Sequence, residues 1–399
     1  MRLLFIAPVI GTHGEVSAGL GLAGQLAEAG IRSHFVVDTH NVALAAAAGH
    51  TVTEIHTAMG ADIVSVVERT AKELRPDAIV LSDYLSYWLM MTRVYRVDPW
   101  FVERLGVPVL PMDLYEWAGT DFRIDHFGAR LEVERRILDM PVWLRPVPWA
   151  RPDADATAPS FPYRAAQPAA RPPAAERRET RRALGVRDTD RLLVLPVSDW
   201  QRHAQTSADP GTRQRALRVP ELLSDAVRRL PDNTHILLVG PHLAGFDGLP
   251  AERTHALPAC APQEFQRLLE SSDAFLSLHI PASGLIRAVH ADLPTVYVTH
   301  GAAGSPEAEE LEPYHLWPLQ WNSVMAPLLA GNPVSDALCR VELLPADDLA
   351  RDIDAVLNDP VERERLAEGR ARYLDACAAL PPTAEVFAAA ANHLSLSAG

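Results

Sequence analysis

The sequence predicts an α/β protein with two doubly wound, Rossmann-like domains that face a central cleft, followed by a helical C-terminal tail. Three observations support this prediction. Short apolar runs alternate with longer helical patterns along most of the 399 residues. A proline- and alanine-rich stretch near the middle interrupts the alternation once. A glycine-containing loop follows the first apolar run and precedes the first helical pattern.

The first domain is expected over residues 1–145. Its predicted strands are short, apolar runs, at residues 3–9, 33–37, 78–81 and 107–110. Its predicted helices lie between these runs, at residues 15–29 and 62–74 and from about residue 85. Gly30 closes the first of these helices. Strands separated by helices in this way form a parallel sheet, so the carboxyl ends of the strands meet at one edge.

Residues 146–176 are expected to form a linker, because the prolines of this segment remove backbone donors and restrict the chain. The pattern then resumes in a second domain over residues 177–360. Its predicted strands are residues 192–197, 234–239, 274–278 and 295–298. Its predicted helices are residues 179–184, 220–230, 262–270 and 284–290. Residues 361–399 are expected to be a helical tail that packs back towards the N-terminal domain.

Composition excludes several classes of function. With 37 Lys and Arg against 51 Asp and Glu, the net charge is −14, which disfavours nucleic-acid binding. Lys72 is the only lysine and lies in a charged helical pattern, which disfavours Schiff-base and P-loop chemistry. Cys260, Cys339 and Cys377 are widely spaced, so we expect reduced thiols and a cytoplasmic location. No apolar stretch of about 18 residues is free of charges and prolines, so no integral membrane segment is expected.

The first loop contains candidate site residues. Residues 11–16 read Gly-Thr-His-Gly-Glu-Val, between the first strand and the first helix. Gly11 and Gly14 would let the backbone approach a ligand at the helix N-terminus. His13 and Glu15 supply titratable groups there. A glutamate in the first turn also complements the helix dipole, so a structural role for Glu15 stays open.

Further candidates follow other strands. Ser198 and Trp200 follow the first strand of the second domain, where Trp200 would stack on a base or sugar or belong to the core. Asp83 follows the strand at 78–81, where it would orient His13 or the acceptor, or cap a helix.

The segment after residue 278 has the features of an anion site. A phosphate would bind the amides of Ser283 and Gly284, and Arg287 lies one turn further along. A surface role for Arg287 and a hydrogen-bonded strand-end role for His279 remain open.

These segments resemble the GT-B glycosyltransferases that use nucleotide sugars, specifically those that tailor antibiotics. Residues 11–16 are similar to the Gly-Thr-Arg-Gly-Asp-Val of those enzymes. Residues 260–265 and 272–279, with the spacing from His279 to Pro294, resemble their donor-side pattern. The resemblance covers both domains.

The resemblance implies a transferase that moves a sugar from a nucleotide-diphosphate donor to a small-molecule acceptor in natural-product metabolism. Glu15 matches the acidic residue that serves as general base, and His13 beside it is the other candidate. His279, Ser283 and Gly284 match the loop that meets the diphosphate. The nucleotide sugar would be a co-substrate, with no metal and no other cofactor. A homodimer remains open.

The sequence also departs from the family pattern. Ile280 and Pro281 occupy positions where the family has two glycines. Arg287 stands where the family has a glutamate that binds the ribose, and the acidic-Gln pair after the last strand is missing. Two alternatives therefore stay open: an epimerase or hydrolase of sugar nucleotides, and a non-catalytic partner protein. Four aromatic residues are candidates for an acceptor pocket or a hinge core: Tyr115, Trp117, Trp317 and Trp321.

Overall fold

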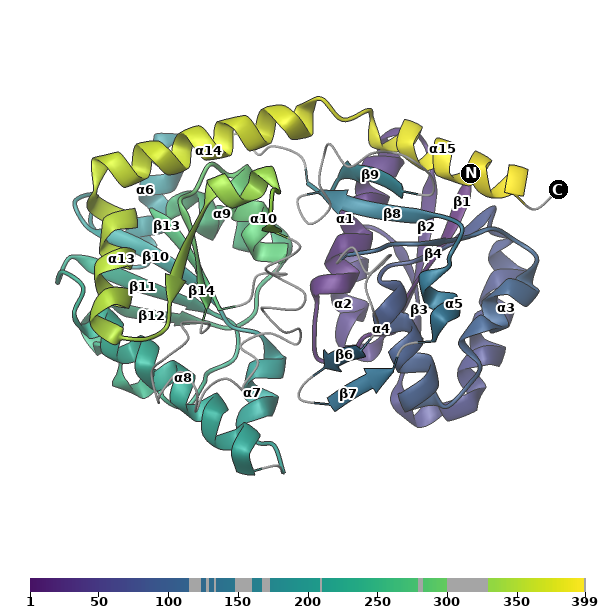
Figure 1. Ribbon diagram of the computed structural model, residues 1–399, viewed down its shortest axis with the longest axis horizontal. Helices are drawn as coiled ribbons and strands as arrows, with labels where there is room; N and C mark the ends of the chain where they lie inside the picture. Colours follow the sequence, from purple (N-terminus) through teal and green to yellow (C-terminus); the bar gives the residue numbers. More distant parts are fainter. Residues whose placement is uncertain are drawn as a thin grey trace. The chain divides into compact units, whose positions relative to one another are not determined.

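The chain divides into two compact units. Unit 1 contains Met1–Phe122, Glu132–Ala165 and Ala376–Gly399, and unit 2 contains Arg123–Leu131 and Ala166–Asp375 (Figure 1). The computed structural model describes residues 1–114, 123–126, 129–132, 134–147, 160–166, 173–208, 210–278, 283–299 and 329–397. Each unit has its own parallel sheet with helices between successive strands, as the alternating sequence pattern predicts.

Unit 1 is built on a five-stranded sheet in the order β3-β2-β1-β4-β5. The strands are β1 (Arg2–Ala7), β2 (Arg32–Asp38), β3 (Thr51–Ile55), β4 (Ala78–Leu81) and β5 (Val109–Pro111). All four strand pairs are parallel. Phe5 of β1 lies in register with Phe35 of β2, and their rings stack with centroids 4.6 Å apart. Both rings are fully buried and form the centre of the unit's core.

The helices of unit 1 cover this sheet (Figure 1). They are α1 (Gly14–Glu28), α2 (Thr39–Ala47), α3 (Ile63–Leu74), α4 (Tyr84–Leu89), α5 (Arg135–Leu138) and α15 (Thr383–Ser397). Shorter turns are two 3-10 helices, at Thr57–Asp62 and Pro99–Leu105, and a π-helix at Met90–Tyr95. Asp38 begins α2 as its N-cap, because its side chain accepts a hydrogen bond from the amide of His40 at 3.1 Å.

Part of the segment expected as a linker is structured within unit 1. Strands β8 (Trp143–Val147) and β9 (Ser160–Arg164) pair in parallel as a two-stranded sheet. Pro162 is tolerated in β9 because β8 is its one neighbour among the described strands. Gln25 of α1 donates to the carbonyl of Arg164 at 2.7 Å and accepts from Thr383 at 2.6 Å. The C-terminal helix α15 is thereby joined to α1 and β9.

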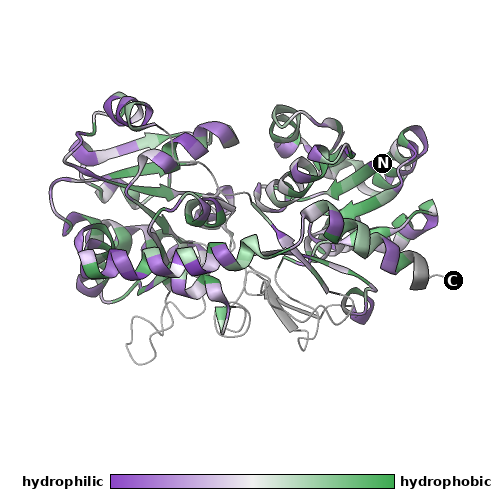
Figure 2. Cartoon of the chain, turned by 90° about the horizontal axis from the view of Figure 1, so that it is seen from above, coloured by the Kyte–Doolittle hydropathy of each residue, from purple (hydrophilic) through white to green (hydrophobic). Residues whose placement is uncertain are grey.

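Unit 2 is built on a six-stranded parallel sheet in the order β12-β11-β10-β13-β14-β15. The strands are β10 (Arg191–Pro196), β11 (Thr234–Val239), β12 (Thr254–Leu257), β13 (Ala274–Ser277), β14 (Thr295–Thr299) and β15 (Leu338–Glu342). This is the 3-2-1-4-5-6 order of dinucleotide-binding folds. The strands are mainly hydrophobic, whereas the helices carry both hydrophobic and hydrophilic residues (Figure 2).

The helices of unit 2 are α6 (Ala174–Ala183), α7 (Asp199–Gln205), α8 (Pro210–Arg228), α9 (Pro262–Ser271), α10 (Ser283–His290), α13 (Ala346–Asn358) and most of α14 (Pro360–Ala378). Short 3-10 turns lie at Phe246–Gly248, Ala251–Arg253 and Pro333–Ala337. Strands β6 (Arg123–His126) and β7 (Ala129–Glu132) form a separate two-stranded sheet.

The predicted start of α8 is wrong. A helix is expected over residues 220–230, but α8 begins at Pro210 and runs through Pro220. Pro220 has no N–H to donate to the carbonyl of Ala216 four residues earlier. The side-chain amide of Gln205 donates to that carbonyl at 3.1 Å instead. The replacement hydrogen bond explains why the helix continues.

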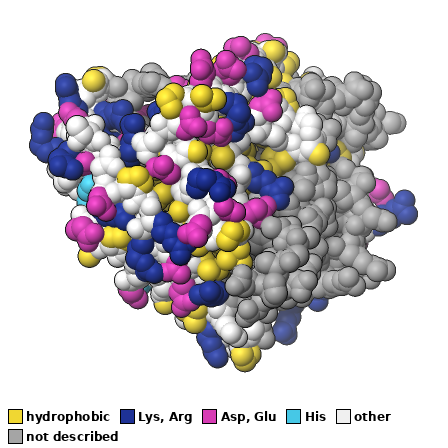
Figure 3. Space-filling view, turned by 60° about the vertical axis from the view of Figure 1, so that its left-hand side comes forward, with side chains coloured by type: hydrophobic (Ala, Val, Ile, Leu, Met, Phe, Trp, Pro, Cys, Tyr) yellow, Lys and Arg dark blue, Asp and Glu magenta, His cyan; other side chains and the backbone are white. Residues whose placement is uncertain are grey.

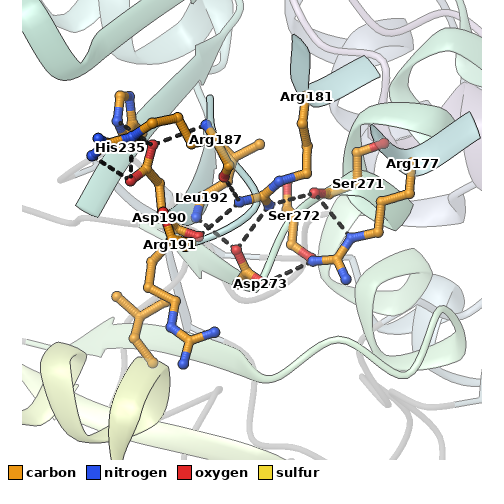
Figure 4. A network of polar contacts seen from close by, with 12 residues as sticks. Arg177, Arg181, Arg187, Asp190, Arg191, Leu192, His235, Ser271, Ser272 and Asp273 are labelled. Carbon is orange, nitrogen blue, oxygen red and sulfur yellow. Dashed lines mark hydrogen bonds and ion pairs between the residues drawn. The ribbon is translucent and has the colours of Figure 1, made fainter. Parts of the chain in front are cut away.

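A partly buried ion network joins α6 to the sheet of unit 2 (Figure 4). Arg177 and Arg181 lie 2.7 and 2.9 Å from the carboxylate of Asp273, which also accepts from the amide of Leu192 at 2.8 Å. Asp273 immediately precedes β13, and Leu192 is near the start of β10. The network therefore lies at the amino ends of these strands, opposite the edge where doubly wound sheets bind ligands.

The surface of unit 2 carries mixed charge. On the face drawn in Figure 3, Lys and Arg side chains are interspersed with Asp and Glu. Among the ion pairs of the unit are Arg218–Glu221 and Arg365–Glu362, at 3.3 and 2.6 Å. A continuous basic stripe, the usual footprint of nucleic-acid binding, is not present on the described part of that face.

We expect Gly19→Ala to destabilise unit 1 by about 1–3 kcal/mol, because overpacking forces backbone shifts. A Cβ at Gly19 would lie 3.4 Å from Phe35 Cε1 and closer still to Ser82, which is fully buried. Gly24→Ala in the same helix is the control, since a Cβ there meets open space, and a gain of up to about 1 kcal/mol is expected. Urea unfolding measures both, and equal effects of the two variants would contradict the packing argument.

Candidate active site

The strand order of unit 1 reverses between β1 and β4. Ligands of doubly wound sheets bind at such a reversal, outside the carboxyl ends of the strands. Glu15 is the second residue of α1, which follows β1, and Asp83 is the N-cap of α4, which follows β4. Two of the three predicted catalytic residues are therefore brought to this edge by different strands, and His13 precedes α1 on the same loop.

Ser86 joins the two carboxyl groups. Its hydroxyl lies 3.5 Å from Glu15 Oε1 and also donates to Asp83 Oδ2. Thr12 Oγ1 donates to Glu15 Oε2 at 3.2 Å, so both oxygens of the partly buried Glu15 have a partner. Because a hydroxyl has a single proton, Ser86 can donate to only one carboxylate at a time. The protonation states of Glu15 and Asp83 are therefore coupled through Ser86.

Burial shifts both carboxyl groups in the same direction. Burial raises the pKa of Glu15, against hydrogen bonds that lower it. Burial, and then the charge of Glu15, raises the pKa of Asp83 to about 7. Asp83 is only 2% exposed, and Asp113, which is fully buried, adds a smaller increase. A proton is thus held in this carboxyl pair near neutral pH, which is a property of general acid–base sites.

Asp83 also caps a helix, which was the alternative interpretation of its position. Its Oδ2 accepts from the amide of Ser86 at 3.1 Å, so the capping role is confirmed. The role of Asp83 in orienting His13 or the acceptor stays a prediction, since its Oδ2 is directed to Ser86. The His13 ring nitrogen Nδ1 lies 2.7 Å from Asn41 Oδ1. Asn41 was missed by the sequence analysis, which predicted no helix at Thr39–Ala47.

The glycines of the first loop have local explanations. Gly11 has a φ of 68°, in the left-handed region that favours glycine, so the turn itself requires this residue. The amide of Gly14, predicted to face a ligand, donates to Thr12 Oγ1 at 3.2 Å. One backbone N–H of the loop is therefore already hydrogen-bonded within the loop.

In unit 2 the strand order reverses between β10 and β13. Ser198 follows β10 as the N-cap of α7 and forms a capping box with Gln201, whose Oε1 accepts from the Ser198 amide at 2.8 Å. Trp200, in the first turn of α7, is partly buried. Both predicted residues thus follow the strand at the reversal, and Ser198 has a structural role of its own.

The segment after residue 278, predicted to bind an anion, is described from Ser283 onwards, where α10 begins. Gly284 is buried, and a Cβ there would lie 3.3 Å from Phe275 Cζ and 3.4 Å from Phe265 Cε1. Close packing of α10 therefore accounts for this glycine. Arg287 lies one turn into α10 and is largely buried, and this burial lowers the pKa of its guanidinium.

Several predicted residues lie outside the described residues. They are His279, Ile280, Pro281, Tyr115, Trp117, Trp317 and Trp321. In the ranges that are described, no three His, Cys, Asp or Glu side chains are grouped to hold a metal ion. Over the same ranges, no helix has both the length and the apolar character needed to cross a membrane. Cys260, Cys339 and Cys377 all lie in the described ranges, and none of them is part of a disulfide.

Comparison with known proteins gives a family and a fold. A model described as a family of unknown function, DUF6365, matches residues 22–310 and 301–398. No curated protein sequence matches the chain. The solved structure of the spinosyn forosaminyltransferase SpnP is similar over 99% of both chains, with 15% identity and a TM-score of 0.61.

Two further solved structures match at 15% identity. Glycosyltransferase VinC in complex with dTDP gives a TM-score of 0.58 over 99% of this chain and 100% of VinC. HepE from Anabaena, in complex with UDP and glucose, gives 0.57 over 99% of this chain and 100% of HepE. The expected resemblance to antibiotic-tailoring glycosyltransferases of the GT-B fold is confirmed at the level of the fold.

We expect Asp83→Asn to stabilise the protein increasingly as the pH rises. The pKa of Asp83 is about 7 in the folded protein against 3.8 ordinarily, so the folded state binds this proton more tightly. Between pH 4 and 7 the unfolded chain therefore loses the proton first, and the free energy of unfolding falls. Asparagine does not titrate, so the free energy of unfolding of the variant does not fall in this way. The gain should rise from near zero at pH 4 to at most about 4 kcal/mol at pH 8.

Urea unfolding of the wild type and of Asp83→Asn between pH 4 and 8 measures this difference. Asp62→Asn, at an exposed position of unit 1, is the control. A constant difference between wild type and Asp83→Asn over this range would show that Asp83 titrates in the folded protein as it does in the unfolded chain.

Proposed function

We propose that this chain, which belongs to the DUF6365 family of unknown function, transfers a sugar from a nucleotide-diphosphate donor to a small-molecule acceptor in natural-product metabolism. The observation that carries the proposal is the coupled pair of Glu15 and Asp83 at the strand reversal of unit 1. The full-length similarity to the glycosyltransferase VinC in complex with dTDP, and to HepE in complex with UDP and glucose, supports the class of donor.

Glu15 acts as the general base. Its carboxylate accepts the proton of the acceptor hydroxyl while that oxygen bonds to the anomeric carbon and the bond from this carbon to the diphosphate oxygen breaks. Attack from the side opposite the leaving group inverts the anomeric centre. A raised carboxylate pKa helps this step, because a stronger base accepts the hydroxyl proton more readily. Thr12 and Ser86 hold the carboxylate in place.

Asp83 retains a proton so that Glu15 is the ionised member of the pair. Asp83 is the more deeply buried of the two, and its pKa of about 7 lies close to neutral pH. Two adjacent carboxylates do not readily ionise together, so a protonated Asp83 favours a charged Glu15. Different surroundings thus give the two carboxyl groups different roles.

The nucleotide diphosphate binds unit 2. Its candidate contacts are Ser198, Trp200, His279, Ser283, Gly284 and Arg287. Arg287 supplies positive charge to the departing diphosphate in place of a metal, and no cofactor besides the sugar donor is needed. We propose that the reaction takes place in the cytoplasm, because three cysteines outside any disulfide suit a reducing compartment.

We expect Glu15→Gln to lower acceptor-dependent release of dTDP or UDP from a panel of nucleotide sugars by about 100-fold or more. The amide keeps the size of the side chain but accepts no proton. Glu28→Gln, at the exposed end of the same helix, is the control and should retain the wild-type rate. Unchanged turnover in Glu15→Gln would remove Glu15 as the base, and rapid release without any acceptor would favour a hydrolase.

We expect Arg287→Glu to abolish stabilisation by nucleoside diphosphates. Ligands that bind the folded state raise the melting temperature by mass action. We therefore expect dTDP, UDP or both to raise the melting temperature of the wild type. Arg267→Glu reverses the same charge at an exposed position of α9 and should leave the shift intact. A shift that survives in Arg287→Glu would return Arg287 to a structural role, and no shift in the wild type would favour a non-catalytic partner protein.

A further inference from the structure

We infer that Asn41 is a positioning residue that fixes the tautomer of His13, so that Nε2 of the neutral ring is a second proton acceptor in the candidate active site. The tautomer follows from hydrogen-bond geometry alone. Its consequence for catalysis rests on the proposed function.

Asn41 is fully buried, and both N–H groups and the oxygen of its side-chain amide have hydrogen-bond partners. The side-chain nitrogen Nδ2 donates to the carbonyl of Val9 at 3.2 Å and to the carbonyl of Thr12 at 3.1 Å. Both carbonyls belong to the loop that follows β1. The two protons of the amide are therefore both directed at this loop.

The two carbonyls also determine which way the amide of Asn41 faces. If the amide were turned over, its oxygen would meet two other oxygens that cannot donate a proton. The oxygen Oδ1 must therefore face His13, whose Nδ1 lies 2.7 Å away. A carbonyl oxygen only accepts, so Nδ1 must donate. A neutral imidazole has a single N–H, and Nε2 is consequently left with its lone pair.

A second contact holds the His13 ring. The ring of His40 stacks on it, with centroids 4.4 Å apart and planes within 5° of parallel. His13 also precedes α1 in the chain, and its carbonyl accepts from the amide of Ser17 at 2.8 Å. The backbone, the hydrogen bond to Asn41 and the stacked ring together restrict this side chain.

The site is therefore equipped to receive protons. Within three residues the chain presents the carboxylate of Glu15 and the unprotonated Nε2 of His13. Both groups are satisfied by a ligand that offers an O–H or N–H, whereas an ionised carboxylate or a phosphodiester has no proton for them at neutral pH and adds like charge beside Glu15. The chemistry selects an uncharged, protic group, such as a hydroxyl or an amine, as the ligand at the unit 1 edge.

Nitrogen-15 NMR of the full chain labelled at histidine tests the tautomer directly. Long-range proton–nitrogen correlations at pH 8 distinguish a protonated ring nitrogen from an unprotonated one, and His13→Gln identifies the His13 signals by their loss. We expect a single form with a proton on Nδ1. A proton on Nε2, or an even mixture of tautomers, would overturn the inference without reference to any activity.

Substitution of Asn41 tests the cause. Asn41→Ala should give a mixture of His13 tautomers. Asn41→Asp lowers stability, because one of its oxygens faces the carbonyls of Val9 and Thr12, but its other oxygen still accepts from Nδ1–H and should keep that nitrogen protonated. Asn233→Ala, at an exposed position of unit 2, is the control. If Asn41→Ala does not fold, the spectra of the wild type and of Asn41→Asp still decide. A His13 spectrum unchanged by Asn41→Ala would show that another contact sets the tautomer.

Activity separates this inference from the proposed function. Where glycosyl transfer is detected, Asn41→Ala should lower kcat by about 2- to 5-fold, in proportion to the fraction of His13 that loses the Nδ1–H form, with little change in the KM of the donor. Asn41→Asp should recover part of the loss. An unchanged kcat would remove His13 from the chemistry. Absence of transfer in the wild type, together with a fixed Nδ1–H tautomer, would refute the proposed function and leave the assignment of Asn41 standing.

Discussion

Burial of two carboxyl groups at the carboxyl ends of β1 and β4 is the constraint on which the candidate active site depends. Asp83 is 2% exposed and faces the nearby charges of Glu15 and Asp113, an arrangement that costs stability at neutral pH. Helix α1 must also approach β4 so closely that only a glycine fits at position 19, against the buried Ser82. Buried carboxyl groups with shifted pKa values are typical of functional sites, so this edge of the sheet is the part of unit 1 that says most about function.

The sequence predicted the central strands well and the edges poorly. Strands β4 and β11 coincide with the predicted residues 78–81 and 234–239, because a strand with neighbours on both sides is a continuous apolar run. Strands β3 and β12 are half-exposed edge strands that mix polar and apolar residues, so neither has a clear period. The helix after β2 was missed with β3, and its residue Asn41 was missed with it.

The sequence predicts where the candidate residues lie along the chain, but not which side chains they contact. Glu15 and Asp83 follow strands, and a position at the end of a strand is visible in a sequence. The contact between Ser86 and Glu15 joins side chains 71 positions apart, a separation that no local sequence pattern contains. The raised pKa of Asp83 likewise arises from burial and from neighbouring charge in the folded chain. Gly284 illustrates the converse, since a glycine that suggested phosphate binding is explained by the packing of Phe265 and Phe275.

The two strand reversals differ in chemistry, and the difference suits them to different ligands. The edge in unit 1 offers a carboxylate and a neutral imidazole, which attract protic groups and oppose the approach of a second anion. The edge in unit 2 is followed by α10, whose Arg287 and helix N-terminus both favour an anion. Under the proposed function the diphosphate is therefore best stabilised on unit 2, and the group that loses a proton is best bound on unit 1. The net charge of −14 does not reveal this difference between the two edges, because the difference depends on a few side chains at two strand ends.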